Sequence, residues 1–226
     1  MAAFDSNEIE NYYAKRALEY ENIYLLPERQ EYIKKSKALL KKYFENKNVL
    51  EIACGTGYWT ETISEVSKNI FAIDINNEVL EIARNKKYHC KVDFIQDDTY
   101  ELGKVKDKYE SIFAGFWFSH IPKARRNAFF DVIHGKLHEN GSVICMDNLY
   151  VEGSSSAISG YDAEGNSYQI RKLQDNSQFE ILKNFYTESE LKDFFSSYSG
   201  EINIDNLKYY WILNYTKGST PGRIAR

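Results

Sequence analysis

Apolar and polar positions alternate with two different periods along the chain, and the change of period separates helices from strands. Apolar side chains recur every three or four positions in residues 7–24 and again in residues 27–45, which predicts two amphipathic helices. Short apolar runs that follow predict five buried strands, at residues 49–53, 69–75, 92–95, 109–118 and 143–147. Helical segments separate them, at residues 58–68, at residues 76–87 and from Pro122 onward. Strand and helix in alternation predict an α/β fold with a largely parallel sheet.

The last third of the chain departs from this alternation. A Gly/Ser-rich link at residues 152–160 leads to two strand-like runs, 168–173 and 179–185, which predict a β-hairpin inserted after the fifth strand. We call residues 149–185 the cap, because an insertion at this place should cover the mouth of a site at the strand ends. A helix at residues 187–197 and strands at 201–206 and 209–216 are then expected to complete the sheet, in which we expect an antiparallel strand at the edge.

The hairpin brings two cations, Arg171 and Lys183, into one small element. A two-residue turn between the strands places them on opposite faces, and a three-residue loop places them on the same face. The turn residues Gln174-Asp175-Asn176-Ser177 allow both, so the register stays open. We expect one domain over residues 1–216 and a disordered polar tail over residues 217–226.

The stretch from Asn48 to Thr60 joins the first buried strand to a glycine turn and then to a helix. Gly55 and Gly57 supply positive φ values, and the helix start that follows presents free N–H groups. A dinucleotide site would carry a third glycine where Thr60 stands, and Glu51 near the strand end would repel a pyrophosphate. Glu51 would instead attract the ammonium group of a methionine moiety. A glycine turn in another kind of α/β protein is the alternative.

Acidic residues follow the second and third strands. Asp74 ends the second strand 17 residues after Gly57, where a carboxylate can accept hydrogen bonds from both ribose hydroxyls of a bound nucleoside. Asp97 and Asp98 follow the third strand, and the sequence does not decide which of them faces the ligand. In each case the alternative is an ordinary solvated carboxylate.

The pattern Glu51-x-Ala53-x-Gly55-x-Gly57 resembles motif I of the class I S-adenosylmethionine-dependent methyltransferases. The segment from Tyr12 to Tyr20 resembles the N-terminal lid of that class, here residues 7–45, and together with the hairpin it is similar to phosphonate O-methyltransferases. The resemblance implies a Rossmann-like, seven-stranded sheet with a helical lid and a hairpin cap. It also implies a set of cofactor-binding residues: Tyr13, Arg16, Tyr20, Glu51, Ala53, Gly55, Gly57, Tyr58, Trp59, Thr60, Asp74, Ile75, Gln96, Asp97, Asp98, Thr99 and Phe116.

The end of the fourth strand is where a transferred methyl group would lie. His120 follows this strand and could orient an acceptor or take its proton, although a hydrogen bond to its own helix start would explain it as well. The resemblance implies that Arg171 and Lys183 meet an anionic substrate. The expected substrate-binding residues are Tyr24, Trp117, His120, Arg171 and Lys183, with His120 as the candidate catalytic residue. The lid helix could equally be plain packing on the sheet.

The composition of the chain limits the classes of partner that we expect it to bind. A net charge of −4 and a pI near 5.7 argue against a long nucleic-acid footprint. Three cysteines at predicted core positions favour reduced thiols over disulfides or a metal site, so we expect no metal. The chain lacks an apolar run long enough to span a membrane and a signal-peptide core, which predicts a soluble, cytoplasmic protein without a membrane partner. Homo-oligomerisation stays open.

These patterns together predict methyl transfer from S-adenosylmethionine to an oxygen atom of a small anionic molecule, such as a phosphonate, phosphate or carboxylate. Two alternatives within the same fold are a small-molecule N- or phenol O-methyltransferase and a catalytically silent S-adenosylmethionine-binding partner protein. A dinucleotide-dependent oxidoreductase is disfavoured by Glu51 and Thr60. The sequence does not identify the acceptor.

Overall fold

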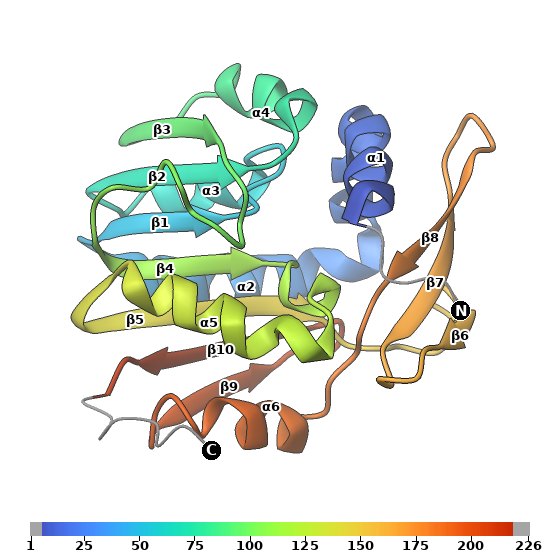
Figure 1. The fold of residues 1–226 in the computed structure, drawn as a ribbon. Helices are drawn as coiled ribbons and strands as arrows, with labels where there is room; N and C mark the ends of the chain where they lie inside the picture. The colour runs from blue at the N-terminus through green and yellow to red at the C-terminus, as the bar shows by residue number, and fades with distance from the viewer. Residues whose placement is uncertain (1–5, 219–226) are drawn as a thin grey trace.

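The computed structural model describes residues 6–218, and its centre is a seven-stranded sheet in the order β3-β2-β1-β4-β5-β10-β9 (Figure 1). The strands of this sheet are β1 (Asn48–Ile52), β2 (Asn69–Asp74), β3 (Lys91–Gln96), β4 (Tyr109–Gly115), β5 (Leu137–Asn148), β9 (Ile202–Asn206) and β10 (Tyr210–Thr216). The first five strands are parallel to one another. The carboxyl ends of these five strands therefore lie together at one end of the sheet, next to the lid and the cap.

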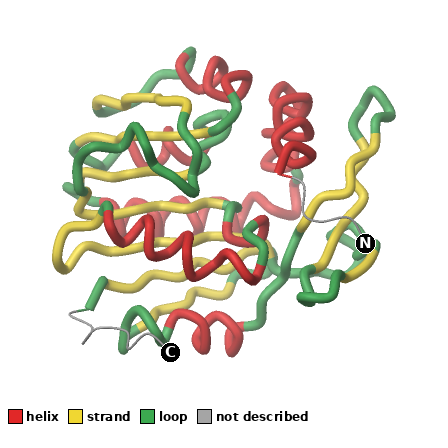
Figure 2. The backbone as a smooth tube through the Cα atoms, viewed as in Figure 1, coloured by secondary structure: helices red, strands yellow, loops and turns green. Residues whose placement is uncertain are grey.

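Helices cover both faces of the sheet (Figures 1 and 2). The α-helices are α1 (Ser6–Arg16), α2 (Gln30–Phe44), α3 (Tyr58–Ser64), α4 (Asn77–Arg84), α5 (Arg126–Gly135) and α6 (Glu188–Phe195). The short 3-10 helices are η1 (Ala17–Leu25), η2 (Pro27–Arg29), η3 (Phe118–His120) and η4 (Lys123–Arg125). Apolar residues of α5 and α6 share one core cluster, and those of α2, α3 and α4 share another. The expected doubly wound α/β fold is confirmed.

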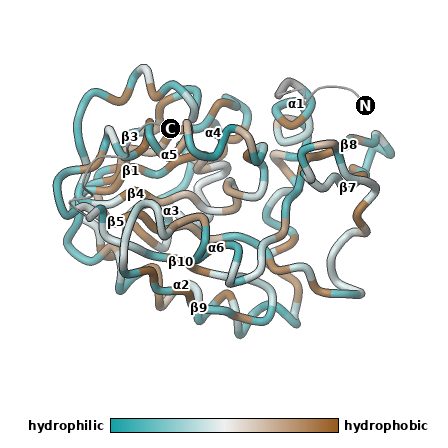
Figure 3. Tube along the Cα trace, turned by 60° about the horizontal axis from the view of Figure 1, so that its bottom comes forward, coloured by the Kyte–Doolittle hydropathy of each residue, from teal (hydrophilic) through white to brown (hydrophobic). Residues whose placement is uncertain are grey.

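The strand residues divide between the two clusters with the period of a pleated sheet. In β10, Trp211 and Leu213 pack into the cluster with α5, whereas Tyr210 and Ile212 pack into the cluster with α2. Since both faces are covered, the inner strands β1, β2 and β4 are mostly apolar, and Figure 3 shows hydrophobic segments in the centre of the molecule. The order of apolar runs along the sequence thus corresponds to a sheet buried on both sides.

One strand runs against the others. β10 is antiparallel to both β5 and β9, so the antiparallel strand lies second from the edge, and β9 takes the edge itself. We expected the antiparallel strand at the edge. The difference arises because β9 and β10 form a hairpin of their own through the turn at residues 207–209, and β9 pairs along the outer side of β10.

The lid is less regular than its periodicity predicts. The helix expected over residues 7–24 is α-helical only as far as Arg16 and continues as the 3-10 helix η1 to Leu25. Long 3-10 segments are uncommon because their hydrogen bonds are poorly aligned, so tertiary contacts must hold η1. Glu21 provides them: its carboxylate accepts a hydrogen bond from the Thr56 hydroxyl (2.6 Å) and pairs with Lys86.

The cap is a three-stranded sheet of β6 (Gly160–Tyr161), β7 (Ser167–Lys172) and β8 (Gln178–Leu182). The backbone N–H of Leu173 donates to the carbonyl of Ser177, which leaves a three-residue loop with Asn176 in the left-handed region (φ 68°). Arg171 is opposite Phe179, and the N–H of Lys183 donates to the Ser167 carbonyl. Arg171 and Lys183 therefore lie on the same face, which decides the register that the sequence left open.

The lid and the cap are joined by a small apolar cluster separate from the two main ones. Ile9 and Tyr12 of α1 pack against Leu173 and Ile181 of the cap. In Figure 1, α1 stands between α4 and the hairpin, beyond the ends of the parallel strands. None of the helices in residues 6–218 has the length and apolar character needed to cross a membrane. The tail beyond Gly218, where we expect disorder, lies outside the described residues.

Candidate functional site

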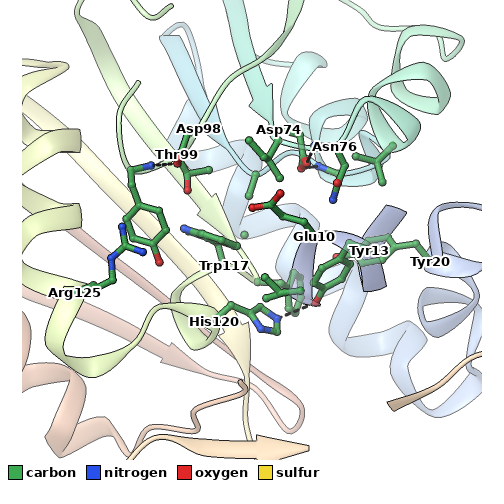
Figure 4. Close-up of a pocket in the computed structure, with 18 residues that line it drawn as sticks. Glu10, Tyr13, Tyr20, Asp74, Asn76, Asp98, Thr99, Trp117, His120 and Arg125 are labelled. Carbon is green, nitrogen blue, oxygen red and sulfur yellow. Dashed lines mark hydrogen bonds between the residues drawn. The ribbon is translucent and has the colours of Figure 1, made fainter. Parts of the chain in front are cut away.

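A cavity of about 260 Å³ opens at the carboxyl ends of β1 to β4, under the lid (Figure 4). We call it the strand-end cavity. Its walls come from the loops after four parallel strands and from α1 and η1, which is the position where open α/β sheets bind ligands. Its lining residues are Ile9, Glu10, Tyr13, Tyr20, Ala53, Gly55, Asp74, Ile75, Asn76, Val79, Asp98, Thr99, Tyr100, Gly115, Phe116, Trp117, His120 and Arg125.

The backbone of this cavity is strained at two non-glycine residues. Ala53 (φ 51°) follows β1 and Phe116 (φ 59°) follows β4, and both lie in the left-handed region that side chains rarely adopt. Gly55 (φ 55°) lies beneath the lid: a Cβ atom there would come within 3.9 Å of Tyr20. Strain of this kind persists where the surrounding structure overrides it, and it concentrates at ligand sites.

Asp74 lies at the end of β2 with its carboxylate in the cavity. Its Oδ2 accepts a hydrogen bond from the Gly55 N–H and its Oδ1 accepts one from the Asn76 N–H, both at 2.9 Å. The carboxylate therefore also fixes the glycine turn after β1. Burial raises the pKa of Asp74 to about 6, although its backbone hydrogen bonds act in the opposite direction.

Of the two carboxylates after β3, Asp98 lines the cavity and Asp97 does not. Asp97 turns into its own loop, where Oδ1 accepts from the Asp98 N–H and Oδ2 accepts from the Lys104 N–H at 2.8 Å. The placement favours Asp98 as the ligand-facing residue, which the sequence left undecided.

The carboxylate expected at the end of β1 lies elsewhere. Glu51 is buried inside the strand, at 2% exposure, and is not among the residues that line the cavity. Burial raises its pKa to about 8, which favours the protonated, neutral form of this carboxyl group. Glu10 of the lid, which the sequence did not single out, points into the cavity in Figure 4.

Seven other residues expected at the cofactor also lie outside the lining: Arg16, Gly57, Tyr58, Trp59, Thr60, Gln96 and Asp97. Gly57 is required by packing, because a Cβ atom there would lie 2.4 Å from the hydroxyl of Tyr88 and 3.2 Å from Cβ of Ala83. Trp59 donates from Nε1 to the Tyr24 hydroxyl (3.1 Å) and so supports the aromatic wall from behind.

A second cavity, of about 170 Å³, lies between the lid and the cap, and we call it the cap cavity. Its walls are aromatic and cationic, and no Asp or Glu is among its lining residues in the described part of the chain. They are Tyr12, Tyr13, Arg16, Tyr20, Ile23, Tyr24, Arg29, Phe116, His120, Asn148, Leu149, Ser154, Ser155, Ser156, Gln169, Arg171, Ile181, Lys183, Phe185 and Tyr210. Arg16, expected at the cofactor, thus faces this cavity, whereas Trp117, expected at the substrate, faces the strand-end cavity.

The two hairpin cations are held differently. Lys183 is 4% exposed, and its Nζ lies 2.8 Å from Oδ1 of Asp147 and 2.7 Å from the Ser119 hydroxyl. Burial lowers the pKa of Lys183 despite this partner. Arg171 is half-buried and donates to the amide oxygen of Gln169 (2.6 Å). The charge of Lys183 is therefore compensated inside the protein, and that of Arg171 has no ion-pair partner among residues 6–218.

The two cavities share a wall of four residues: Tyr13, Tyr20, Phe116 and His120. The Nδ1 of His120 lies 2.7 Å from the Leu182 carbonyl, which accepts only from an N–H; Nε2 is therefore unprotonated and accepts from the Tyr13 hydroxyl at 2.8 Å (Figure 4). Burial, and next the charge of Lys183, hold the pKa of His120 well below its usual range. His120 is thus neutral and joins the lid to the cap.

Sequence reasoning missed three charged residues of the lining: Glu10, Arg29 and Arg125. Glu10 follows the apolar Ile9 on the lid helix, and its direction depends on how the lid packs. Arg125 lies 3.7 Å from the ring centroid of Tyr100, so the two cover one end of the strand-end cavity. A helix start signalled by Pro27 could have drawn attention to Arg29, but its burial could not have been inferred.

Comparisons with known proteins agree with this geometry. Residues 49–141 match the family model of a methyltransferase domain. Over 175 residues the chain is 24% identical to the malonyl-[acyl-carrier protein] O-methyltransferase of Bacillus anthracis, which covers 75% of this chain and 61% of that protein. It is 22% identical over 118 residues to the demethylmenaquinone methyltransferase of Oceanobacillus iheyensis, covering 50% and 47%. The chain thus spans less than two thirds of the length of these relatives.

A solved structure shares nearly the whole fold. The structure of DhpI in complex with SAM and HEP superimposes with a TM-score of 0.77 at 23% identity, covering 94% of this chain and 99% of DhpI. The lid and the cap are therefore included in the likeness, in addition to the sheet. The chain has the fold of the class I S-adenosylmethionine-dependent methyltransferases, resembles DhpI along most of its length and carries a methyltransferase domain over residues 49–141.

Proposed function

We propose that this protein transfers the methyl group of S-adenosylmethionine to an oxygen atom of a small anionic acceptor. The observation that carries the proposal is the cap cavity, whose wall holds Arg16, Arg29, Arg171 and Lys183 and, within residues 6–218, no carboxylate. This wall adjoins the strand-end cavity through His120 and its neighbours. A cationic wall of this kind attracts an anion and holds it by charge-assisted hydrogen bonds.

The residues of the strand-end cavity fit S-adenosylmethionine. Asp74 would accept hydrogen bonds from the ribose hydroxyls, and Asp98 would accept one from the adenine amino group. Glu10 adds a third carboxylate, which suits a cofactor with a cationic ammonium and sulfonium. The cofactor supplies an electrophilic methyl group, which an acceptor oxygen attacks in line with the sulfur–carbon bond. Tyr13 and Tyr20 would cover the bound cofactor from the lid.

Residues 6–218 place no strong base at the wall between the cavities, and an ionised acceptor needs none. His120 has a lowered pKa and already accepts from Tyr13, whose own pKa burial raises well above its usual range. The role of the protein is therefore to align the acceptor oxygen with the methyl group and to exclude water. These effects can contribute about 7–11 kcal/mol in favourable cases. His120 fixes the lid against the cap while the arginines hold the anion.

A neutral acceptor is the second candidate, supported by the aromatic side of the cap cavity. Tyr24 and Phe116 line it, and a phenol could lie against their rings. The acceptor oxygen would then have to lose a proton, and His120 Nε2 would have to take it. A protein that binds the cofactor without transferring its methyl group is the third reading to be tested.

The deciding experiment is turnover of methyl-labelled S-adenosylmethionine over a panel of small phosphonates, phosphates, carboxylates and phenols. We expect wild-type protein to methylate members of the anionic classes. Arg171→Ala should lower kcat/KM for the acceptor by two orders of magnitude or more, mainly through KM, because Arg171 contacts the anion before and during transfer. Arg171→Lys should rescue poorly if the contact is bidentate.

Lys172→Ala is the matched control, since Lys172 is the next residue of β7 and points to the exposed side of the cap. It should retain wild-type turnover, and both variants should retain wild-type affinity for S-adenosylhomocysteine by calorimetry. Wild-type efficiency in Arg171→Ala, or turnover confined to phenols, would contradict an anionic acceptor. Cofactor binding without turnover of any class would favour the silent partner protein.

A further inference from the structure

The cap cavity contains a second buried cation that the fold leaves without a counter-charge. Arg29 ends η2, is 5% exposed and lines this cavity. Among residues 6–218, no Asp or Glu forms an ion pair with it, and its Nε has no hydrogen-bond partner. Lys183 in the same cavity has Asp147 at 2.8 Å. The protein therefore compensates one buried cation and not the other.

The neighbours of Arg29 are hydrogen-bonding and aromatic groups. Its Nη1 donates to the Tyr210 hydroxyl (3.3 Å) and its Nη2 donates to the Ser154 hydroxyl (3.1 Å). The guanidinium also lies 4.9 Å from the ring centroid of Tyr209. These contacts hold the side chain in place, yet neutral groups replace only part of the hydration that a charged group loses on burial.

The same contacts prepare the site for an anion. Both hydroxyls accept from Arg29, so each still has its own O–H to donate. Together with the charge of Arg29, these two O–H groups give the cavity wall one charge and two donors at one place, which is the environment that a carboxylate or phosphonate requires. A buried, uncompensated guanidinium is costly in the free protein, and an anionic ligand would remove that cost.

This group of donors has other neighbours than Arg16 and Arg171, the two other arginines that line the cap cavity. Arg16 lies 5.3 Å from the ring centroid of Tyr20, one of the four residues that the two cavities share, and the charges of Arg16 and Arg171 both lower the pKa of His120. Arg29 instead has Ser154, Tyr209 and Tyr210 around its guanidinium group, so it occupies another part of the same cavity. The two places are connected through Gln169, which accepts from Arg171 and donates to the carbonyl of Ser156.

We propose that the methyl acceptor carries a second anionic group and that Arg29, Ser154 and Tyr210 bind it. The inference rests on the proposed function and narrows it from anions in general to small molecules with two acidic groups. The group near Arg171 and His120 receives the methyl, and the other fixes the molecule by its far end. Two anchor points would select both the length of the acceptor and which of its acidic groups is methylated.

The test compares acceptors that differ only in the second acidic group: propylphosphonate with 3-phosphonopropionate, and butyrate with succinate. Wild-type protein should show a kcat/KM at least tenfold higher for the member with two acidic groups in the pair that it methylates. Arg29→Gln should reduce this ratio of kcat/KM values, two acidic groups over one, at least tenfold. Arg84→Gln is the control, because Arg84 lies on the exposed side of α4, and it should keep the wild-type ratio.

Tyr210→Phe removes one donor with little change in packing and should reduce the same ratio about threefold, so a poorly folded Arg29→Gln does not end the test. If wild-type protein methylates both members of the pair with equal kcat/KM, the inference is overturned. It is also overturned if Arg29→Gln and Tyr210→Phe lower kcat/KM by the same factor for both members. Methylation of phenols with neither member turned over would overturn the proposed function itself. Methylation of anions without a preference would overturn this inference alone.

Discussion

The strand-end cavity and the cap cavity share four wall residues and carry opposite charge. Carboxylates of Glu10, Asp74 and Asp98 face the first, and guanidinium groups of Arg16, Arg29 and Arg171 line the second. The difference has a simple origin in the fold. The acids follow parallel strands or belong to the lid helix above them, whereas the cations come from the lid, its helix junction and the cap.

This contrast suggests how methyl transfer would be organised. A sulfonium on the acidic side and an oxyanion on the basic side attract each other, and both charges disappear when the methyl group moves. In a site of low dielectric constant, that loss of charge is not opposed by solvation of the reactants. The charged walls would thus act mainly in binding and alignment, so we expect substitutions there to change affinities more than kcat.

A substitution of Lys183 tests whether every cation that lines the cap cavity binds the acceptor. Lys183→Ala should lower the free energy of unfolding by about 3–5 kcal/mol, because it leaves Asp147 buried without its partner. Arg171→Ala, in contrast, should leave the free energy of unfolding nearly unchanged. Denaturant titration of both variants measures the difference.

The double variant Lys183→Met with Asp147→Leu is the control, since it removes both charges together and should recover most of the lost stability. A Lys183→Ala variant with wild-type stability would mean that the ion pair is not structural and that all four cations act alike.

A substitution of Asp74 tests the role of the carboxylates that line the strand-end cavity. Asp74→Ala should weaken S-adenosylmethionine binding by about 1.5–3 kcal/mol, the usual contribution of hydrogen bonds to a charged group. The pKa of Asp74 is raised to about 6, and the ionised carboxylate is the better acceptor. Affinity of wild-type protein should therefore fall as the pH drops below about 6 and stay level above 7.

Calorimetry with S-adenosylhomocysteine across this pH range measures both effects. Glu78→Ala serves as the control, because Glu78 is exposed on α4 close to the cavity but not in it. The same affinity in Asp74→Ala as in wild-type protein would remove Asp74 from the cofactor site and leave the acidic lining without a role.

A substitution of His120 tests the role of the wall that the two cavities share, and we expect it to have the smallest effect of these substitutions. With its pKa well below the usual value of about 6.5, His120 stays neutral through the range where free histidine titrates. At saturating S-adenosylmethionine, which removes the effect of Asp74 on cofactor affinity, the rate should show no titration near pH 6.5, and His120→Asn should keep activity within about tenfold of wild type. A rate that rises tenfold per pH unit below 6.5, and vanishes in the variant, would make His120 a general base and favour a phenol or alcohol acceptor.

Most of the fold could be predicted because its signals are local. The apolar runs of β1, β2 and β4 and the glycine turn after β1 are each specified within about ten residues of sequence, and their order implies the sheet. The site was predictable where it coincides with strand ends: Asp74, Asp98, Phe116 and His120 all line a cavity. Glu51, expected at the cofactor, does not line this cavity, because a strand that is buried on both faces holds its side chains inside the layers.

By itself, the sequence determined the class of fold, the place of the candidate site at the strand ends and the presence of a lid and a cap. Tertiary structure alone decided the charges within them. Whether Lys183 meets Asp147, and whether Arg29 meets any carboxylate, depends on segments more than thirty residues apart in the chain. The three-residue loop that places Arg171 on the same face as Lys183 also depends on cross-strand pairing. Local patterns carry no information on such pairings, because the energy of a buried charge depends on everything that the fold brings around it.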